Sequence, residues 1–186
     1  MRNIFTLLLF AFFLVSADVE VSDVNYKSND TFLKEEYILN GVGIRDKFIF
    51  DIYTIGLYLK EKSSDGFEIL ESKTNKFVRI VIVSSLVTAN KFSDGLDDGF
   101  EKSTEGNITP IKKEIELLRK GFGSDFKKGE EFIVYFDKSG ETKIYKSNNK
   151  PYIIPPSRPF QKALLGMWIG KHPVLDDLKV ELLGID

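Results

Sequence analysis

The chain has 186 residues, of which 42% are hydrophobic and 29% charged, a composition typical of one folded domain and too apolar for a disordered chain. Its formal net charge of -2 gives no sign of the basic surface that nucleic-acid binding usually requires. The chain contains no cysteine, which excludes disulfides, thiolate metal sites and a cysteine nucleophile.

Residues 1–17, MRNIFTLLLFAFFLVSA, have the features of a secretory signal peptide. Arg2 precedes an uncharged apolar run over residues 4–15, and the segment ends in Val-Ser-Ala, small or slim residues of the kind that signal peptidase reads. The run is short for a spanning helix, which needs about 20 residues; an uncleaved anchor is the alternative. We therefore expect an exported mature chain over residues 18–186, periplasmic or secreted, without a stable membrane anchor.

Two adjacent segments, residues 35–45 and 46–62, are rich in β-branched and aromatic residues and predict antiparallel strands that reverse tightly near Asp46 and Lys47. Strict alternation divides the second strand into two faces. One face would carry Phe48, Phe50, Ile52, Thr54, Gly56 and Tyr58, and the other Ile49, Asp51, Tyr53, Ile55, Leu57 and Leu59. Because both faces are largely apolar, this strand is predicted to be central and covered on both sides.

Further along, a third strand is expected over residues 76–86, and the apolar period then lengthens to three or four residues. This pattern predicts a helix over residues 88–102 with Thr88 as its N-cap. Another helix, a strand pair around an Asp-Lys-Ser-Gly turn and two final helices complete the chain. The order predicts a single α+β domain over residues 18–186.

Residues with catalytic potential are scarce. The single histidine, His172, lies in a predicted loop and is expected to be an ordinary surface residue, and one histidine excludes a His-rich metal site. The Gly-Val-Gly sequence at residues 41–43 is too short for a dinucleotide-binding fingerprint and is not followed by a helix. We therefore expect no metal and no cofactor.

Four segments resemble the chalcone isomerase-like superfamily in order and spacing. They are LNGVGIRDKFIFDIYTIGLYL, FVRIVIVSSLVTANKFSDGLDDGF, KKGEEFIVYFDKSGETKIY and FQKALLGMWIGKHPVLDDLKVELLG. The first resembles the family's Gly-x-Gly-x-Arg segment and the strand that follows it. The resemblance implies an open-faced β-sandwich of the α+β class, in which a large antiparallel sheet has helices packed on one face and a cleft between them.

The family contains plant enzymes that cyclise chalcones and relatives that bind fatty acids without being isomerases. In both, the resemblance implies that the arginine at the position of Arg45 points into the cleft and holds an anionic oxygen of the ligand. A guanidinium group matches a carboxylate with two parallel hydrogen bonds. The alternative is that Arg45 ends a strand and forms a surface ion pair with Asp46 or Asp51.

The positions that serve catalysis in the plant enzymes are mostly changed here. Phe92 stands where those enzymes carry a tyrosine, Gly99 replaces an asparagine, and Met167 and Trp168 replace a late Ser/Thr-Met pair. The resemblance therefore favours a binding protein without catalytic residues over an intramolecular lyase of the chalcone isomerase type. A structural or partner-binding module without a ligand is a third possibility.

The predicted ligand is a small amphiphile, a fatty acid or similar apolar carboxylate, because an apolar cleft with few polar groups suits such a molecule. The expected ligand-binding residues are Arg45, Tyr58, Tyr53, Phe92, Met167 and Trp168. Tyr58 is favoured over Tyr53 as the hydroxyl partner of Arg45, because Tyr58 shares a strand face with Phe48, Phe50 and Ile52, along which an acyl chain could run. Tyr53 lies on the opposite face, so both tyrosines can serve one pocket only if a bulge intervenes.

Overall fold

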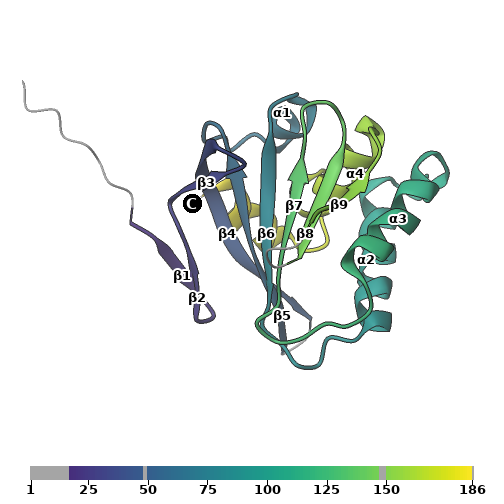
Figure 1. Ribbon diagram of the computed structural model, residues 1–186, viewed down its shortest axis with the longest axis horizontal. Helices are drawn as coiled ribbons and strands as arrows, with labels where there is room; N and C mark the ends of the chain where they lie inside the picture. Colours follow the sequence, from purple (N-terminus) through teal and green to yellow (C-terminus); the bar gives the residue numbers. More distant parts are fainter. Residues whose placement is uncertain (1–16, 48–49, 147–149, 186) are drawn as a thin grey trace, which may run out of the picture.

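The computed structural model describes residues 17–47, 50–146 and 150–185 (Figure 1). The predicted signal peptide lies almost entirely outside these residues, as do Phe48 and Ile49 of the predicted strand. Within the described part of the chain, no helix combines the length and the apolar character that crossing a bilayer would require.

A seven-stranded antiparallel sheet forms the frame of the molecule, with its strands in the order β3-β4-β5-β6-β7-β8-β9. The strands are β3 (Asn29–Phe32), β4 (Glu35–Lys47), β5 (Phe50–Leu59), β6 (Lys76–Ile82), β7 (Glu131–Phe136), β8 (Thr142–Lys146) and β9 (Tyr152–Ile154). From β3 to β9, strands that follow each other in the sequence lie side by side in the sheet. This order is expected when antiparallel strands are joined by short connections or by helices that lead directly to the next strand. The predicted central position of β5 is confirmed.

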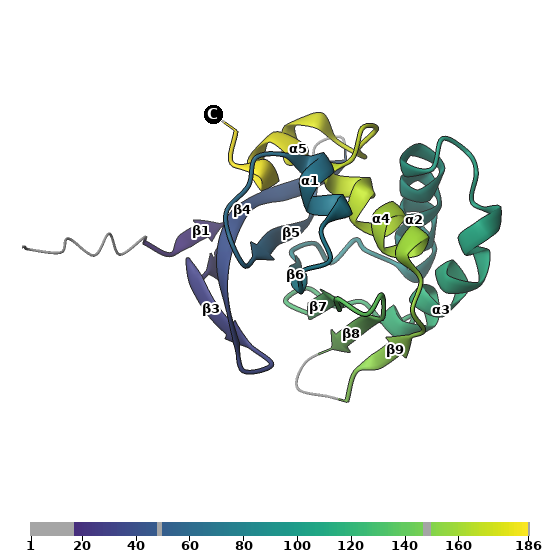
Figure 2. The same cartoon turned by 90° about the horizontal axis from the view of Figure 1, so that it is seen from above.

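The helices gather on the concave side of this sheet. They are α1 (Gly66–Glu71), α2 (Ala89–Ser103), α3 (Lys112–Phe122), α4 (Arg158–Ile169) and α5 (Asp176–Leu183), and a 3₁₀ turn (Thr109–Ile111) precedes α3. Thr88 is the N-cap of α2, as predicted, and its hydroxyl accepts a hydrogen bond from the backbone of Lys91. Figure 2 shows the sheet curling around α4, with α2 and α3 beyond it. The α+β class, the large antiparallel sheet and the helices on one face are confirmed.

The apolar core lies between the sheet and α4, a helix that is apolar on nearly all sides. From Ala163 to Ile169 every residue of α4 is buried, which is expected for a helix enclosed by a sheet on one side and other helices on the other. Large aromatic side chains, among them Phe100, Phe132 and Phe160, fill the rest of this core.

A second, aromatic cluster covers the convex face of the sheet. Its buried members are Tyr26, Tyr37, Leu39, Tyr58, Phe77 and Tyr135. A short hairpin of β1 (Val19–Val21) and β2 (Val24–Tyr26) carries Tyr26 onto this face, where its hydroxyl donates a hydrogen bond of 2.8 Å to the Thr54 hydroxyl. This hairpin and the helices together cover β5 on both sides, as its composition predicts.

The register between β4 and β5 contains a β-bulge that changes the faces of the second strand. Arg45 pairs with Tyr53, but the next residue, Asp46, pairs with Asp51, which leaves Ile52 as the extra residue. A bulge reverses the alternation beyond it. The strict two-face division predicted for this strand is therefore wrong, and Ile52 and Tyr53 both reach the concave side.

The Asp-Lys-Ser-Gly turn joins β7 to β8 as predicted, and it carries an acid-sensitive contact. Although burial raises the pKa of Asp137, hydrogen bonds from Ser139 and the Lys143 ammonium at 3.0 Å lower it from 3.8 to about 2. A carboxyl group with a lowered pKa stabilises the fold fully above its unfolded pKa, and this stabilisation is lost as pH falls through the folded pKa.

We expect Asp137→Asn to lower the free energy of unfolding by about 1–2 kcal/mol at neutral pH, after allowance for solvent screening. The difference between variant and wild type should shrink between pH 4 and pH 2, because the wild-type carboxyl then becomes neutral too. Urea unfolding at a series of pH values measures this difference. A difference that stays constant down to pH 2 would contradict the assignment.

Candidate functional site

A cavity of about 360 Å³ lies between the concave face of the sheet and the helices α2 and α4, a size within the range of small-molecule sites. Most of its lining is apolar. The apolar side chains are Phe50, Ile52, Ile80, Leu86, Val87, Phe92, Leu96, Phe122, Leu164, Met167, Trp168 and Val174. Arg45 and Tyr53 contribute polar groups from the sheet, and Lys91, Asp94 and Asp98 contribute charges from α2.

The Gly-x-Gly-x-Arg sequence has a direct structural explanation. Gly41, Gly43 and Arg45 pair with Leu57, Ile55 and Tyr53 of β5, respectively, and they face the concave side together.

At the two glycines the helix α5 lies directly on the strand. A Cβ atom at Gly41 would lie 2.7 Å from the carbonyl oxygen of Leu182, and one at Gly43 would lie 2.8 Å from Leu178 Cδ1. Real side chains do not approach so closely, so the glycines give α5 its position. Arg45 comes next on the same face, where its side chain lines the cavity.

Arg45 is half-buried, and its guanidinium donates a hydrogen bond to the backbone carbonyl of Asp46. Among the residues that the structure describes, no carboxylate lies within ion-pair distance of Arg45. The surface ion pair with Asp46 or Asp51 that the sequence leaves open is therefore not formed. Because a guanidinium carries five N–H donors, most of those of Arg45 have no acceptor among the described residues and can serve an anionic group in the cavity.

Tyr53 is the cross-strand neighbour of Arg45 and shares its face of the sheet. Its hydroxyl oxygen accepts a hydrogen bond of 2.9 Å from the indole N–H of Trp168. Burial raises the pKa of Tyr53, an effect that the indole hydrogen bond and the charge of Arg45 oppose only in part. The phenol therefore stays neutral at physiological pH, and because an indole N–H only donates, the phenol proton is left to donate elsewhere.

Tyr58, the hydroxyl partner favoured by strict alternation, does not line the cavity. It lies on the convex face, where its ring stacks on Phe77 with 4.5 Å between centroids. Its hydroxyl donates a hydrogen bond of 3.0 Å to the backbone carbonyl of Lys27. The bulge at Ile52 is the reason, because it turns Tyr53 rather than Tyr58 toward the face that carries Arg45.

The other residues expected from the sequence converge on the cavity. Phe92 packs against Phe122 and Phe126 at one wall, with ring centroids 4.8 Å and 4.4 Å apart. Met167 and Trp168, each only 3% exposed, contribute from α4. Five of the six expected residues thus line one cavity. Their contact with a ligand stays a prediction.

Sequence reasoning missed the charged residues of α2 and the exposed apolar residues at the edge of the cavity. Lys91, Asp94 and Asp98 are exposed and lie on one side of α2, next to the apolar face that the three- to four-residue apolar repeat predicts. Phe50 and Leu86 are 48% and 46% exposed. No local pattern marks these residues, because only the packing of α2 over the sheet brings them to one opening.

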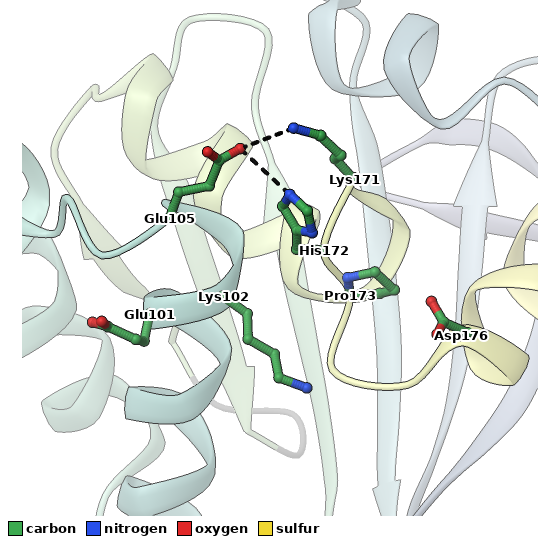
Figure 3. Close-up of a pocket in the computed structure, with 7 residues that line it drawn as sticks. All are labelled: Glu101, Lys102, Glu105, Lys171, His172, Pro173 and Asp176. Carbon is green, nitrogen blue, oxygen red and sulfur yellow. Dashed lines mark hydrogen bonds and ion pairs between the residues drawn. The ribbon is translucent and has the colours of Figure 1, made fainter.

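A second hollow, of about 440 Å³, is polar and open (Figure 3). There Glu105 lies between Lys171 and His172, at 3.4 Å and 3.5 Å, and all three side chains are about half exposed or more. His172 is thus a surface loop residue, as expected. Surface ion pairs of this kind contribute little energy. Among the described residues there is also no group of three or more side chains suited to hold a metal ion.

A curled antiparallel sheet whose helices enclose an apolar cavity, with an arginine at its wall, is the architecture that the Gly-x-Gly-x-Arg resemblance implies. The chain matches the family model described as chalcone isomerase-like over residues 18–184, and it belongs to that family.

Among solved structures, the fold is similar to the crystal structure of a fatty-acid binding protein from Arabidopsis thaliana. The TM-score is 0.68, the sequence identity is 13%, and the match covers 90% of this chain and 96% of that one. At this identity the likeness concerns the fold. No curated protein sequence is significantly similar to the chain.

Proposed function

We propose that the protein binds a fatty acid or a similar apolar carboxylate and does not catalyse a reaction on it. The observation that carries this proposal is the pairing of Arg45 and Tyr53 on the sheet wall of a mostly apolar cavity, whose other charged residues lie on the α2 side. Arg45 would hold the carboxylate through two N–H groups, and the Tyr53 hydroxyl would donate to the same group. The fatty-acid binding protein with the same fold supports the choice of ligand class.

The apolar lining supplies the larger part of the expected affinity. Transfer of an alkyl chain from water contributes about 0.8 kcal/mol for each buried methylene. The cavity also argues against a purely structural module, because such a module would have a filled interior.

The single tryptophan makes the proposal testable in solution. Trp168 lines the cavity and hydrogen-bonds to Tyr53, so a bound ligand should change its fluorescence. Delipidated protein comprising residues 18–186 is titrated with palmitate and, as a control, with methyl palmitate, which has no carboxylate. We expect saturable binding of palmitate and clearly weaker binding of the ester. Equal affinity for palmitate and methyl palmitate would mean that the carboxylate does not contribute to binding. No binding of either ligand would reject the proposal.

The protein is proposed to act after export. The basic, apolar and small-residue parts of residues 1–17 support cleavage after Ala17. The intact mass of protein recovered from its native compartment should correspond to a chain that begins at Asp18. Recovery of a membrane-associated chain that still begins at Met1 would contradict export in the cleaved form.

Chalcone cyclisation is expected to be absent. Phe92, which lines the cavity, has no hydroxyl, and Gly99 lies against Met167 with no side chain to donate a hydrogen bond. Loss of a hydrogen bond that stabilises a developing oxyanion typically reduces turnover by about 100- to 1000-fold. An absorbance assay with a chalcone should therefore show no rate above the spontaneous reaction, and robust turnover at micromolar protein would support the lyase alternative instead.

A further inference from the structure

Two glycines lie four residues apart on α2, and packing explains only one of them. A Cβ atom at Gly99 would lie 3.1 Å from the sulfur and 3.2 Å from Cγ of Met167, so glycine here lets α2 approach α4 without displacing the Met167 side chain. At Gly95 an added Cβ atom would have no heavy atom within 4 Å. Gly95 is also an ordinary helical residue, without the positive φ that favours glycine.

Glycine at position 95 therefore weakens the helix without serving its packing, since glycine is among the least favourable residues inside a helix. The position has a second property. Gly95 is exposed to solvent and at the same time lines the cavity, which marks it as part of the opening. The half-exposed apolar side chains Phe50 and Leu86 line the same cavity and are exposed at its edge.

We propose that Gly95 is a specificity-determining residue, whose missing side chain keeps the α2 side of the cavity open for the apolar chain of the ligand. The inference rests on the proposed function for the identity of the ligand, but not for the existence of the opening. A larger side chain at this position would extend past the space that a Cβ atom needs and fill part of the cavity that Gly95 lines, which would leave less room for the ligand. Long-chain ligands should be affected more than short ones.

The test uses Gly95→Phe and Gly95→Leu, with two matched controls. Gly95→Ala adds only the Cβ atom that the structure accommodates, and Glu101→Phe adds the same bulk at an exposed position of α2 outside the cavity. Circular dichroism and thermal unfolding verify the fold of each variant. Affinities for octanoate and palmitate are measured by titration, and access to the cavity is measured in ligand-free protein by acrylamide quenching of Trp168.

We expect the two bulky variants at position 95 to weaken palmitate binding by about 10- to 100-fold, the equivalent of about 1.4–2.8 kcal/mol and within the range typical of overpacking. Octanoate binding should change less, and quenching of Trp168 should fall below that of Gly95→Ala. Both controls should match wild type in palmitate affinity and in Trp168 quenching. In thermal unfolding, Gly95→Ala should have a higher unfolding temperature than wild type.

The inference would be wrong if both bulky variants had the same Trp168 quenching and the same palmitate affinity as Gly95→Ala. If the wild-type protein binds no fatty acid but Trp168 quenching still falls in the bulky variants, the proposed ligand is rejected. The inference that Gly95 keeps the cavity open is then still supported.

Discussion

Replacement of Arg45 by alanine should weaken fatty-acid binding by about 1.5–3 kcal/mol, or about 10- to 150-fold, the usual contribution of a hydrogen bond to a charged group. The reason is geometric. Within the described part of the chain Arg45 has no carboxylate partner, so the ligand would be the first anion to use its free N–H groups. Arg45→Lys should recover only part of the loss, because an ammonium cannot form two parallel hydrogen bonds to a carboxylate.

Two tyrosine variants provide the matched control for this prediction. Tyr53→Phe removes the hydroxyl that lies beside Arg45, whereas Tyr58→Phe removes one on the convex face of the same strand. Calorimetric titration with palmitate should show weaker binding for Tyr53→Phe and unchanged binding for Tyr58→Phe. If Arg45→Ala binds palmitate like wild type while its circular dichroism is unchanged, Arg45 has no part in the site.

The second large effect is expected on stability. Gly41→Ala should lower the free energy of unfolding by about 2–3 kcal/mol, in the upper part of the range for overpacked sites. The added Cβ atom would meet the backbone carbonyl oxygens of Glu181 and Leu182, and a helix backbone cannot move aside without leaving the sheet.

Gly43→Ala is the informative comparison. There the added atom would meet the side chains of Glu181 and Leu178, which can change conformation. Its effect in urea unfolding should therefore be clearly smaller than that of Gly41→Ala. Equal and small losses in the two variants would mean that α5 does not rest on these glycines as described.

Much of the fold could be predicted from periodicity and local signals. The long strands β4, β5 and β6 are rich in β-branched and aromatic residues, Thr88 starts α2, and the Asp-Lys-Ser-Gly turn joins β7 to β8. The short hairpin β1–β2 and the helix α1 gave no such signal. Three-residue strands and a six-residue helix are too short for a period to show, and tertiary packing stabilises them.

The site was predictable only in part, for a reason that lies in one residue. Local alternation cannot reveal an extra residue in a strand, so the bulge at Ile52 reverses the faces and exchanges Tyr58 for Tyr53. Contacts between distant segments were also out of reach. Tyr53 and Trp168 are 115 residues apart, and no pattern in either segment predicts their hydrogen bond. Arg45 was found because it belongs to a motif, not because of its local sequence.

The ionisation of the bound carboxyl group tests the central claim most directly. Palmitate labelled with ¹³C at its carboxyl carbon is bound to the protein, and its chemical shift is followed by NMR as pH is lowered. A nearby guanidinium favours the charged form, so the bound carboxyl should titrate well below the value of about 4.3 typical of an unperturbed side-chain carboxyl, and Arg45→Ala should raise it. A bound carboxyl that titrates identically in wild type and Arg45→Ala would contradict the account.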